Sequence, residues 1–394
     1  MTVTYTGDVG NATVRAFCRL LWRWKGSIWK AVYVELFVWL VAYGILSIIY
    51  NFLLGEDEKR VFENVCAFFA KYEDYIPLTF ILGFFVSLVI TRWWSMFENL
   101  GWIDIVAMYI AHHVHGEDER GRLVRRNLIR HLLFYQVLCY RDISVCIRKR
   151  FPRLESCIDA GYITVHELKH FHQLNSRYPQ YWTPINWVVA GLRRAALEGR
   201  IRSDKEIEDL QRRVMEFRNN LGSLLGYDWV PIPLLYSQVV SISVRLYFVM
   251  ALLGRQNLEH SLDPSYIPPI NLYVPIVSIM QFAFYVGWLK VAEALLNPFG
   301  DDDDDFEINW LLDRNLEVGL TILDERGAMP LVKDRFWSSD VVLPVYSEAT
   351  VNRVNNPMIG SAVGFDLEEE EPVMIPRVVN DEEEYMRSRT GSLF

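Results

Sequence analysis

Cysteine is scarce in this sequence: there are five among 394 residues, and no two of them form a CxxC pair. An odd number at irregular spacing argues against a disulfide framework and against a zinc ribbon. We therefore expect reduced thiols that face the cytosol. The five are Cys18, Cys66, Cys139, Cys146 and Cys157.

A clustered basic surface is also missing, which argues against nucleic acid as a partner. The formal net charge is −9, but it is unevenly distributed along the chain. Residues 1–299 hold 32 basic and 27 acidic residues, whereas residues 300–394 hold 8 basic and 22 acidic residues. The acidity therefore belongs to the C-terminal region and not to the body of the protein.

No small-residue cleavage site follows a short apolar core near the N-terminus, so we expect no cleavable signal peptide. What the sequence has in quantity is hydrophobic residues, which make up 51% of it. Four stretches approach or exceed the ~20 apolar residues that a membrane-spanning helix needs. They are 31–54, 75–90 (with the helix expected to start near Phe62), 230–253 and 270–289. We predict four transmembrane helices.

Two of the predicted spans contain a charged residue, Glu35 in the first and Arg245 in the third. Charged groups inside a membrane face protein or water, so these two are candidates to pair across the bundle. The simpler interpretation is a buried polar contact without a transport function. A fifth apolar stretch, 131–146, is too short to span a membrane and carries Arg141, so we expect a buried helix of a soluble region.

Basic residues near the spans predict their orientation. Five Lys or Arg residues precede the first span, and a stretch rich in Lys and Arg follows the second. We therefore expect both termini and the region 95–228 in the cytosol. That region is predicted to be mostly helical, since apolar residues in 204–218 recur near a period of 3.6.

These patterns divide the chain into six segments. They are a cytosolic N-terminal segment (1–30), spans 1 and 2 (31–94), a cytosolic helical region (95–228), spans 3 and 4 (229–296), an acidic turn with a following helix (297–337) and an acidic, loop-like tail (338–394). Two runs of acidic residues in the tail are typical of solvated chain.

Several motifs, in order along residues 1–330, are similar to those of bestrophins. They include RWKGS (23–27), ILGFF (81–85) running into TRWW (91–94), and FYVGWLKVAE (284–293). The most specific is NPFGDDDDDFE (297–307), followed by DRN (313–315). The chain therefore resembles the bestrophin family over most of its length, and only weakly in the tail beyond about residue 345.

The resemblance implies a fold class and an activity. The implied fold is an all-α membrane protein with four transmembrane helices and a large helical cytosolic region, assembled as a homopentamer around a central pore. The implied activity is that of a calcium-activated chloride channel and not of an enzyme. Its partners would be further copies of itself and the lipid bilayer, and its implied location is the plasma membrane. The alternative is a non-conducting membrane protein that regulates or scaffolds other channels.

Ile76, Phe80 and Phe84 follow one another at intervals of four residues, which predicts that they share one face of a helix. By itself such a stripe usually faces lipid or packs in a core. The resemblance matches these three to the pore neck of the family, where a ring of apolar side chains loses water easily and closes the pore. It matches Lys205 to a second, cytosolic aperture, and the alternative is a solvated lysine in the first turn of a helix.

A run of five aspartates, 301–305, follows the last predicted span and a Pro-Phe-Gly turn. Such a run alone is usually solvated. Calcium prefers six to eight oxygen ligands, from carboxylates and carbonyls alike. The resemblance implies side-chain ligands from Asp302 and Asp305 and backbone carbonyl ligands from Gly10, Ala294 and Asn297.

Two further patterns have competing interpretations. HELKH at 166–170 matches the zinc-binding pattern HExxH, but so short a motif recurs by chance, and we expect Thr164 to cap an ordinary helix there. Residues 352–366 resemble the inhibitory tail of the family at Pro357, Met358 and Ser361, and a disordered linker is the alternative. A phosphate on Ser361 would add charge to a docked segment.

Overall fold

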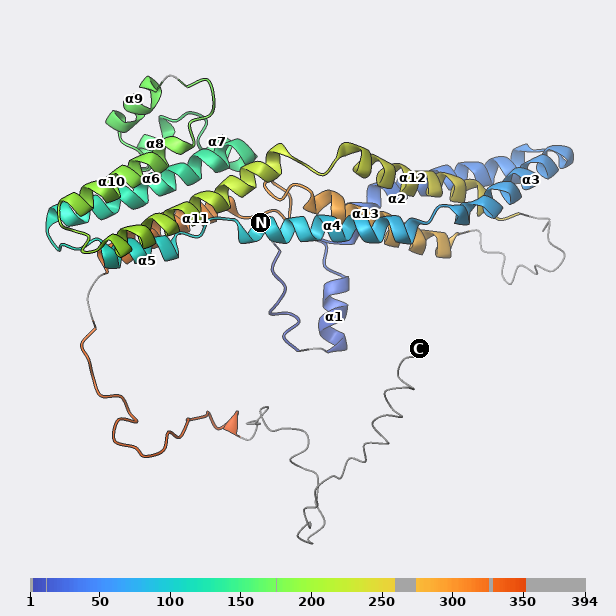
Figure 1. Ribbon diagram of the computed structural model, residues 1–394. Helices are drawn as coiled ribbons and strands as arrows, with labels where there is room; N and C mark the ends of the chain where they lie inside the picture. Colours follow the sequence, from blue (N-terminus) through green and yellow to red (C-terminus); the bar gives the residue numbers. More distant parts are fainter. Residues whose placement is uncertain (1–2, 12, 175, 259–273, 326–328, 352–394) are drawn as a thin grey trace, which may run out of the picture. The chain divides into compact units, whose positions relative to one another are not determined.

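The computed structural model describes residues 3–11, 13–174, 176–258, 274–325 and 329–351 (Figure 1). It divides into two units, Met1–Gly327 and Ala328–Phe394. Every regular element in the described ranges is a helix, which confirms the all-α prediction.

Within the described residues, four helical segments are long and apolar enough to cross a membrane, which confirms the four predicted spans. They are α2 (Ile28–Ile48) continued by the π-helical turn η1 (Ile49–Leu53), α4 (Leu78–Glu98), α12 (Leu234–Gly254) and α13 (Ile276–Leu295). The remaining helices are α1 (Val14–Leu21), α3 (Glu56–Tyr72), η2 (Glu73–Tyr75), α5 (Asp104–His113), α6 (Glu119–Ile143), α7 (Val145–Arg150), α8 (Ser156–Asp159), α9 (Val165–Gln173), α10 (Trp182–Leu197), α11 (Asp204–Trp229) and α14 (Ile308–Asp324).

The second span starts later than the sequence suggests. We expected its helix to begin near Phe62, but that residue lies in the separate helix α3, and α4 begins at Leu78. Pro77 immediately precedes α4, and Ile76 before it has an extended backbone. Proline has no N–H to donate and disfavours helical geometry in the residue before it, so the chain breaks here and a new helix starts.

The fourth span is also displaced from its predicted bounds. It starts at Ile276, after Pro275, and continues through Lys290 to Leu295. The first predicted positions, 270–273, lie outside the described residues. A lysine near the end of a span is tolerated because its long side chain reaches toward polar partners.

The first unit contains two separate apolar cores. The span core joins α2, α4, α12 and α13, with Trp39, Val89 and Phe282 among its buried residues. The domain core is built around α6, against which α5, α10, α11 and α14 pack. The predicted buried soluble helix at 131–146 is confirmed for the part that belongs to α6, where Leu133 and Phe134 are fully buried.

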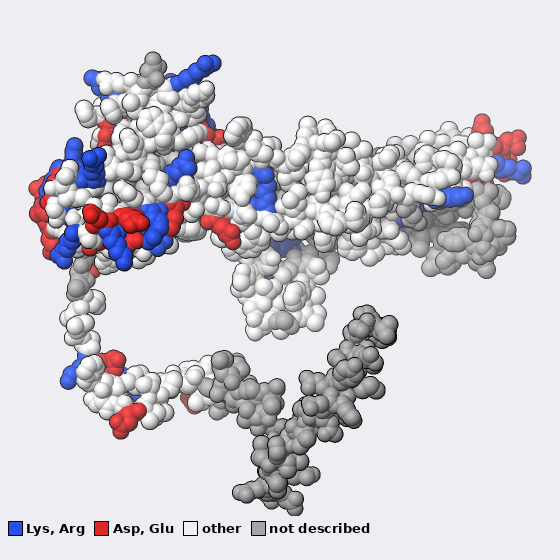
Figure 2. All heavy atoms as spheres, viewed as in Figure 1, with Lys and Arg blue, Asp and Glu red and all other residues white. Residues whose placement is uncertain are grey.

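Charge separates these two regions on the surface. On the face shown in Figure 2, Lys, Arg, Asp and Glu gather over the domain helices and at the far end of the spans. The surface over the spans between them is almost free of charge. Charged side chains are costly against hydrocarbon, so this uncharged zone is the part of the first unit that suits a bilayer.

The charged residues inside the spans pair with one another. Arg245 Nη2 lies 3.6 Å from Glu35 Oε1, so the candidate pair is confirmed. Lys290 Nζ lies 2.7 Å from the same Glu35 oxygen and 2.8 Å from Glu293 Oε2. Arg245 Nη2 also lies 3.4 Å from Glu293 Oε1. Two acids and two bases from α2, α12 and α13 therefore neutralise each other where an unpaired charge would be expensive.

Of the second unit, the structure describes residues 329–351. They form turns, such as the one in which the N–H of Thr350 donates to Ser347 O at 2.9 Å. The predicted tail positions Pro357, Met358 and Ser361 lie outside the described residues.

Candidate functional site

Two exposed aromatic rings mark the first half of α4. Phe80 and Phe84 are 65% and 61% exposed, and their ring centroids lie 4.8 Å apart. The other side of the helix is buried in the span core through Leu82, Phe85 and Val89. The described chain therefore leaves an aromatic surface on α4 uncovered.

Ile76 does not belong to that surface in the way predicted. It lies before Pro77 with an extended backbone, is partly buried and packs against the span core. The expectation that it shares a helix face with Phe80 and Phe84 is wrong, because α4 does not begin until Leu78. Its assignment to the pore neck stays a prediction.

The chain between α13 and α14 folds into a compact acidic turn, residues 297–307. The N–H of Phe306 donates to Pro298 O at 2.9 Å and closes the turn. Inside it, the N–H of Asp302 donates to Asp305 Oδ2 at 2.7 Å. The carboxylate of Asp305 is thus held in place by the backbone of its own turn, and the residue is only 4% exposed.

The outer aspartates of the turn have basic partners from elsewhere in the chain. Asp303 Oδ2 lies 2.5 Å from Lys30 Nζ at the start of α2 and accepts the N–H of Gly26 at 3.2 Å. Asp301 Oδ2 lies 3.3 Å from Lys149 Nζ on α7, and its Oδ1 accepts a hydrogen bond from the Cys146 thiol at 3.2 Å. These two carboxylates tie the turn to α2 and α7.

The pKa shifts of these carboxyl groups follow their surroundings. The hydrogen bond from Lys30 lowers the pKa of Asp303, and those from Cys146 and Lys149 lower the pKa of Asp301. Burial raises the pKa of Asp305, and the nearby charge of Asp302 adds to the rise. A desolvated carboxylate beside a second one favours the binding of a cation.

The turn offers oxygen atoms of the kind that calcium prefers. A Cβ built on Gly300 would lie 2.7 Å from Asp305 Oδ2 and 3.9 Å from Asn297 O, so both oxygens border the space that the glycine leaves open. Ala294 lies in the last turn of α13, where helix carbonyls lack intrahelical donors. Carboxylates of Asp302 and Asp305 with these carbonyls make a hard, mixed oxygen set, which fits calcium.

Two observations limit this site. In the described ranges, no three His, Cys, Asp or Glu side chains converge as a metal cluster, so any cation here depends on backbone carbonyls. For Gly10, a Cβ built on the backbone would meet Gly7 O at 3.5 Å and, apart from the chain neighbours, nothing else within 4 Å, so no atom of the turn lies on that side of the glycine. The calcium site with its five ligands therefore stays a prediction. Of the five residues, Asn297, Asp302 and Asp305 lie in the acidic turn and Ala294 lies just before it.

The acidic turn also packs against α4. The ring of Phe306 lies 5.2 Å from that of Trp93 and 5.8 Å from that of Phe97, centroid to centroid. Trp93 and Phe97 occupy the last part of the helix that carries Phe80 and Phe84 near its start. A displacement of the acidic turn would therefore be transmitted to α4 through these aromatic contacts, since packed interiors transmit strain.

Lys205 lies in the first turn of α11, two residues after the N-cap residue Ser203. Its side chain is exposed, and Ser203 Oγ accepts the N–H of Glu206 at 3.3 Å. This agrees with both interpretations given above, so the aperture assignment stays a prediction.

The HExxH segment serves a structural purpose. Thr164 caps α9, as predicted, and forms a capping box with Glu167. The carboxylate of Glu167 is held by Arg130 Nη1 at 2.5 Å and His131 Nε2 at 2.7 Å. Burial alone would raise the pKa of Glu167, but these hydrogen bonds outweigh it and hold the pKa below its usual range. The glutamate is thus engaged as an anchor between α9 and α6.

Sequence reasoning missed the residues that connect the site to its surroundings. Lys30, Lys149 and Phe306 each make a contact that depends on residues far away in the chain. The available signal was the pair Trp93 and Phe97, two aromatic residues four apart at the end of a span, which favours packing against another element.

The fold and the site together define a class of protein. It is a helical membrane protein with four spans and a helical domain, in which an acidic turn that presents several oxygen atoms joins the last span, α13, to α14 of the domain.

Comparison with known proteins gives the family. A family profile described as "Bestrophin, RFP-TM, chloride channel" matches residues 1–325. The chain is 45% identical over 389 residues to Bestrophin homolog 15 of Caenorhabditis elegans, covering 96% of this chain and 74% of that protein. It is 43% identical over 376 residues to Bestrophin-3 of Homo sapiens, covering 93% of this chain and 55% of the relative. This chain belongs to the bestrophin family, a family of membrane channels, and the predicted resemblance is confirmed.

Solved structures agree on the fold. A bacterial bestrophin homolog from Klebsiella pneumoniae superposes with a TM-score of 0.54 at 14% identity, covering 76% of this chain and 99% of that chain. The chain spans only about half the length of human Bestrophin-3, so the activity of such longer relatives is a proposal for it.

Proposed function

We propose that this chain is one subunit of a homopentameric chloride channel of the plasma membrane, opened by cytosolic calcium and with both termini in the cytosol. The family description supports conduction of chloride. The contact of Phe306 with Trp93 carries the regulatory part, because it joins the acidic turn to the helix that exposes Phe80 and Phe84.

The gate of this channel is the neck formed by α4. Around a fivefold axis, Phe80 and Phe84 form rings of apolar side chains, with Ile76 at the entrance to the helix. A narrow apolar ring excludes water and with it hydrated ions, so a small movement of α4 is enough to open or close the pore. The positive edges of aromatic rings suit an anion passing beside them.

The acidic turn is the sensor. Asp302 and Asp305 supply carboxylates, and Ala294 and Asn297 supply carbonyl oxygens, to which Gly10 is added when the N-terminal segment moves to the turn. Calcium bound there would supply positive charge that cancels the repulsion between the two carboxylates. The open and closed arrangements of the turn must differ in their affinity for the ion if binding is to shift the gate.

Two further parts belong to the same proposal. Five copies of Lys205 at a cytosolic aperture would concentrate anions near the pore. The tail at Pro357, Met358 and Ser361 would inhibit the channel, with phosphate on Ser361 as a control.

Recording from the purified chain in a planar bilayer tests the proposal, with chloride as the only permeant ion and calcium added stepwise on one side. The expected result is a current that is absent without calcium and rises with it. Asp305→Asn, as the matched variant, should assemble normally and lose the dependence on calcium.

Different failures have different meanings. No current under any condition would favour the non-conducting regulator or scaffold. A chloride current that ignores calcium would keep the channel and remove the acidic turn as its sensor.

A further inference from the structure

Helix α1 has an apolar stripe without a partner in the described chain. Val14, Phe17, Cys18 and Leu21 recur at i, i+3, i+4 and i+7, so they share one face of the helix. Val14 is 81% exposed, Phe17 51% and Leu21 65%. No residue of α1 is buried. A helix that leaves its whole apolar face uncovered calls for a surface from outside its own chain.

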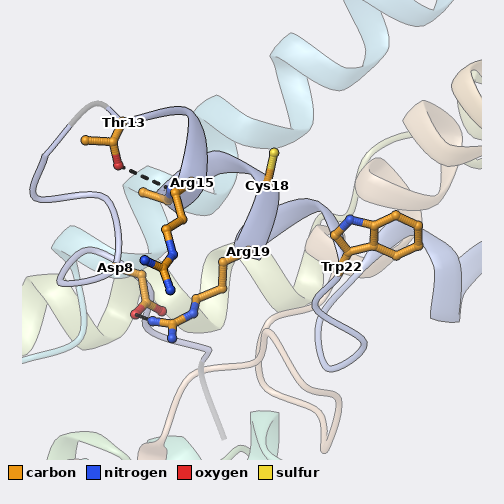
Figure 3. Close-up of a pocket in the computed structure, with 7 residues that line it drawn as sticks. Asp8, Thr13, Arg15, Cys18, Arg19 and Trp22 are labelled. Atoms are coloured by element: carbon orange, nitrogen blue, oxygen red, sulfur yellow. Dashed lines mark hydrogen bonds and ion pairs between the residues drawn. The ribbon is translucent and has the colours of Figure 1, made fainter.

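Basic side chains flank the stripe. Arg15 and Arg19 are four residues apart, and Arg19 Nη1 lies 3.7 Å from Asp8 Oδ1. Figure 3 shows Arg15 and Arg19 extending toward Asp8, whereas Cys18 and Trp22 point away from it. The helix is therefore amphipathic, with cationic groups at the edge of its apolar face.

The whole N-terminal segment carries a net positive charge, like the edge of the apolar stripe. Residues 3–30 contain five basic residues and one acidic residue, Asp8. Among the described residues, Lys30 pairs with Asp303 at the start of the first span, and Arg19 and Arg23 each have a nitrogen 3.7 Å from Asp8. Positive charge next to a span is attracted to anionic lipid headgroups.

The position of α1 keeps it near the membrane. The helix ends at Leu21 and the first span starts at Ile28. The six residues between them reach about 20 Å when fully extended, so the end of α1 stays within about that distance of the start of the first span. In Figure 1, α1 runs across the direction of the spans, as a helix lying in the membrane plane does.

Three tryptophans lie where α1 joins the first span. Trp22, Trp24 and Trp29 lie between the end of α1 and the first turn of the span, and all three are exposed. Tryptophan is enriched at membrane–water interfaces because its ring is apolar and its N–H is polar.

We propose that α1 lies on the membrane surface next to the helical domain, with its apolar stripe at the acyl boundary and its arginines among anionic lipid headgroups. A lipid surface accounts for the stripe, the flanking arginines and the tryptophans together, whereas a second protein chain accounts for the stripe alone. The proposal depends on insertion of the spans and not on conduction or on calcium.

A spin label on α1 tests this in the full chain, reconstituted in vesicles of phosphatidylcholine and phosphatidylserine. The label goes on Cys18, which is exposed on α1, in a Cys146→Ser background, because the other three cysteines are buried. The matched control carries the label at Arg15→Cys in a Cys18→Ser, Cys146→Ser chain. Collisions with oxygen, which concentrates in lipid, are compared with collisions with a water-soluble nickel chelate.

The label at Cys18 should favour oxygen, and the label at position 15 should favour the nickel chelate. Replacing Arg15 and Arg19 by Gln should lower the equilibrium constant for docking of α1 on the membrane by about fivefold for each arginine lost. Omitting phosphatidylserine should lower the same constant, because the arginines then lose their anionic partners. Phe17→Asp, which changes an exposed side chain and spares the cores, should move the Cys18 label into water.

Two outcomes would overturn the proposal. A Cys18 label that collides freely with the nickel chelate in the unaltered helix would place the stripe in water. A label shielded from both reagents would place the stripe against protein, and a second copy of the chain would then be its partner.

Discussion

Gly300 is the residue that lets the Asp305 carboxylate approach the backbone of the acidic turn. A side chain at this position would meet Asp305 Oδ2 at 2.7 Å, which is closer than real Cβ atoms come to other atoms. The five aspartates that follow Gly300 are identical in sequence, but their surroundings differ. Asp301 and Asp303 are paired with lysines, whereas Asp305 is buried inside the turn.

Gly300→Ala should therefore displace the Asp305 carboxylate while leaving the helices in place. We expect the apparent calcium affinity of the chloride current to fall about tenfold, which corresponds to about 1.4 kcal/mol, and the chain to lose about 1–3 kcal/mol of stability through overpacking. Calcium titration of the current and thermal unfolding measure the two effects.

Gly226→Ala is the control, because a Cβ at this position on α11 would meet nothing within 4 Å. It should leave both measurements nearly unchanged. If Gly300→Ala behaves like this control, then Asp305 does not bind the activating ion.

At the scale of secondary-structure elements, α4 has two ends with different neighbours. Its first half exposes Phe80 and Phe84, and its last part carries Trp93 and Phe97 against Phe306 of the acidic turn. A rigid helix is able to carry a displacement from one end to the other, which is how a distant turn acts on the neck in the proposed mechanism.

Phe306→Ala should separate ion binding from gating. Calcium should still bind, since the ligand oxygens are unchanged, but opening should need a higher calcium concentration or fail. Truncation of a buried phenylalanine costs about 3–5 kcal/mol of stability, so a stability control is required. Phe171→Ala supplies it, because Phe171 is buried in the domain core on α9.

Calcium binding is measured by isothermal titration and gating by bilayer recording on the same preparations. The mechanism predicts normal gating in Phe171→Ala and impaired gating in Phe306→Ala. Equal impairment in both would mean that lost stability, and not lost contact with α4, explains the effect.

At the scale of the whole molecule, the first unit joins a span core to a domain core, and it leaves apolar surface on α4 and α1 that the described chain does not cover. The two surfaces have different chemistry. The α4 surface is aromatic and without charge, which suits a ring of identical copies, whereas the α1 stripe is bordered by arginines, which suits lipid.

The pentamer predicts a defined mass. The chain has a mass of 46.2 kDa, so the detergent-corrected mass of the purified channel should be about five times that value. Light scattering coupled to size-exclusion chromatography measures it. A monomer or dimer that still conducts chloride would exclude a neck built from five copies of α4.

The sequence by itself determined the helical class, the four spans, the candidate pair Glu35 and Arg245 and the cap at Thr164. Each of these follows from local periodicity, from hydrophobic length or from the high cost of an unpaired charge in a membrane. It also carried the family motifs, which cover most of the chain.

Only the tertiary structure decided which aspartates have lysine partners and what Phe306 touches. The start of α4 is different, because Pro77 breaks the helix locally and leaves Ile76 outside it, although hydrophobicity alone gives no boundary there. Asp301, Asp303 and Asp305 are chemically identical in the sequence, and they differ only because α2, α7 and the turn itself bring different groups to each. Such contacts join residues far apart in the chain, so no local pattern contains them.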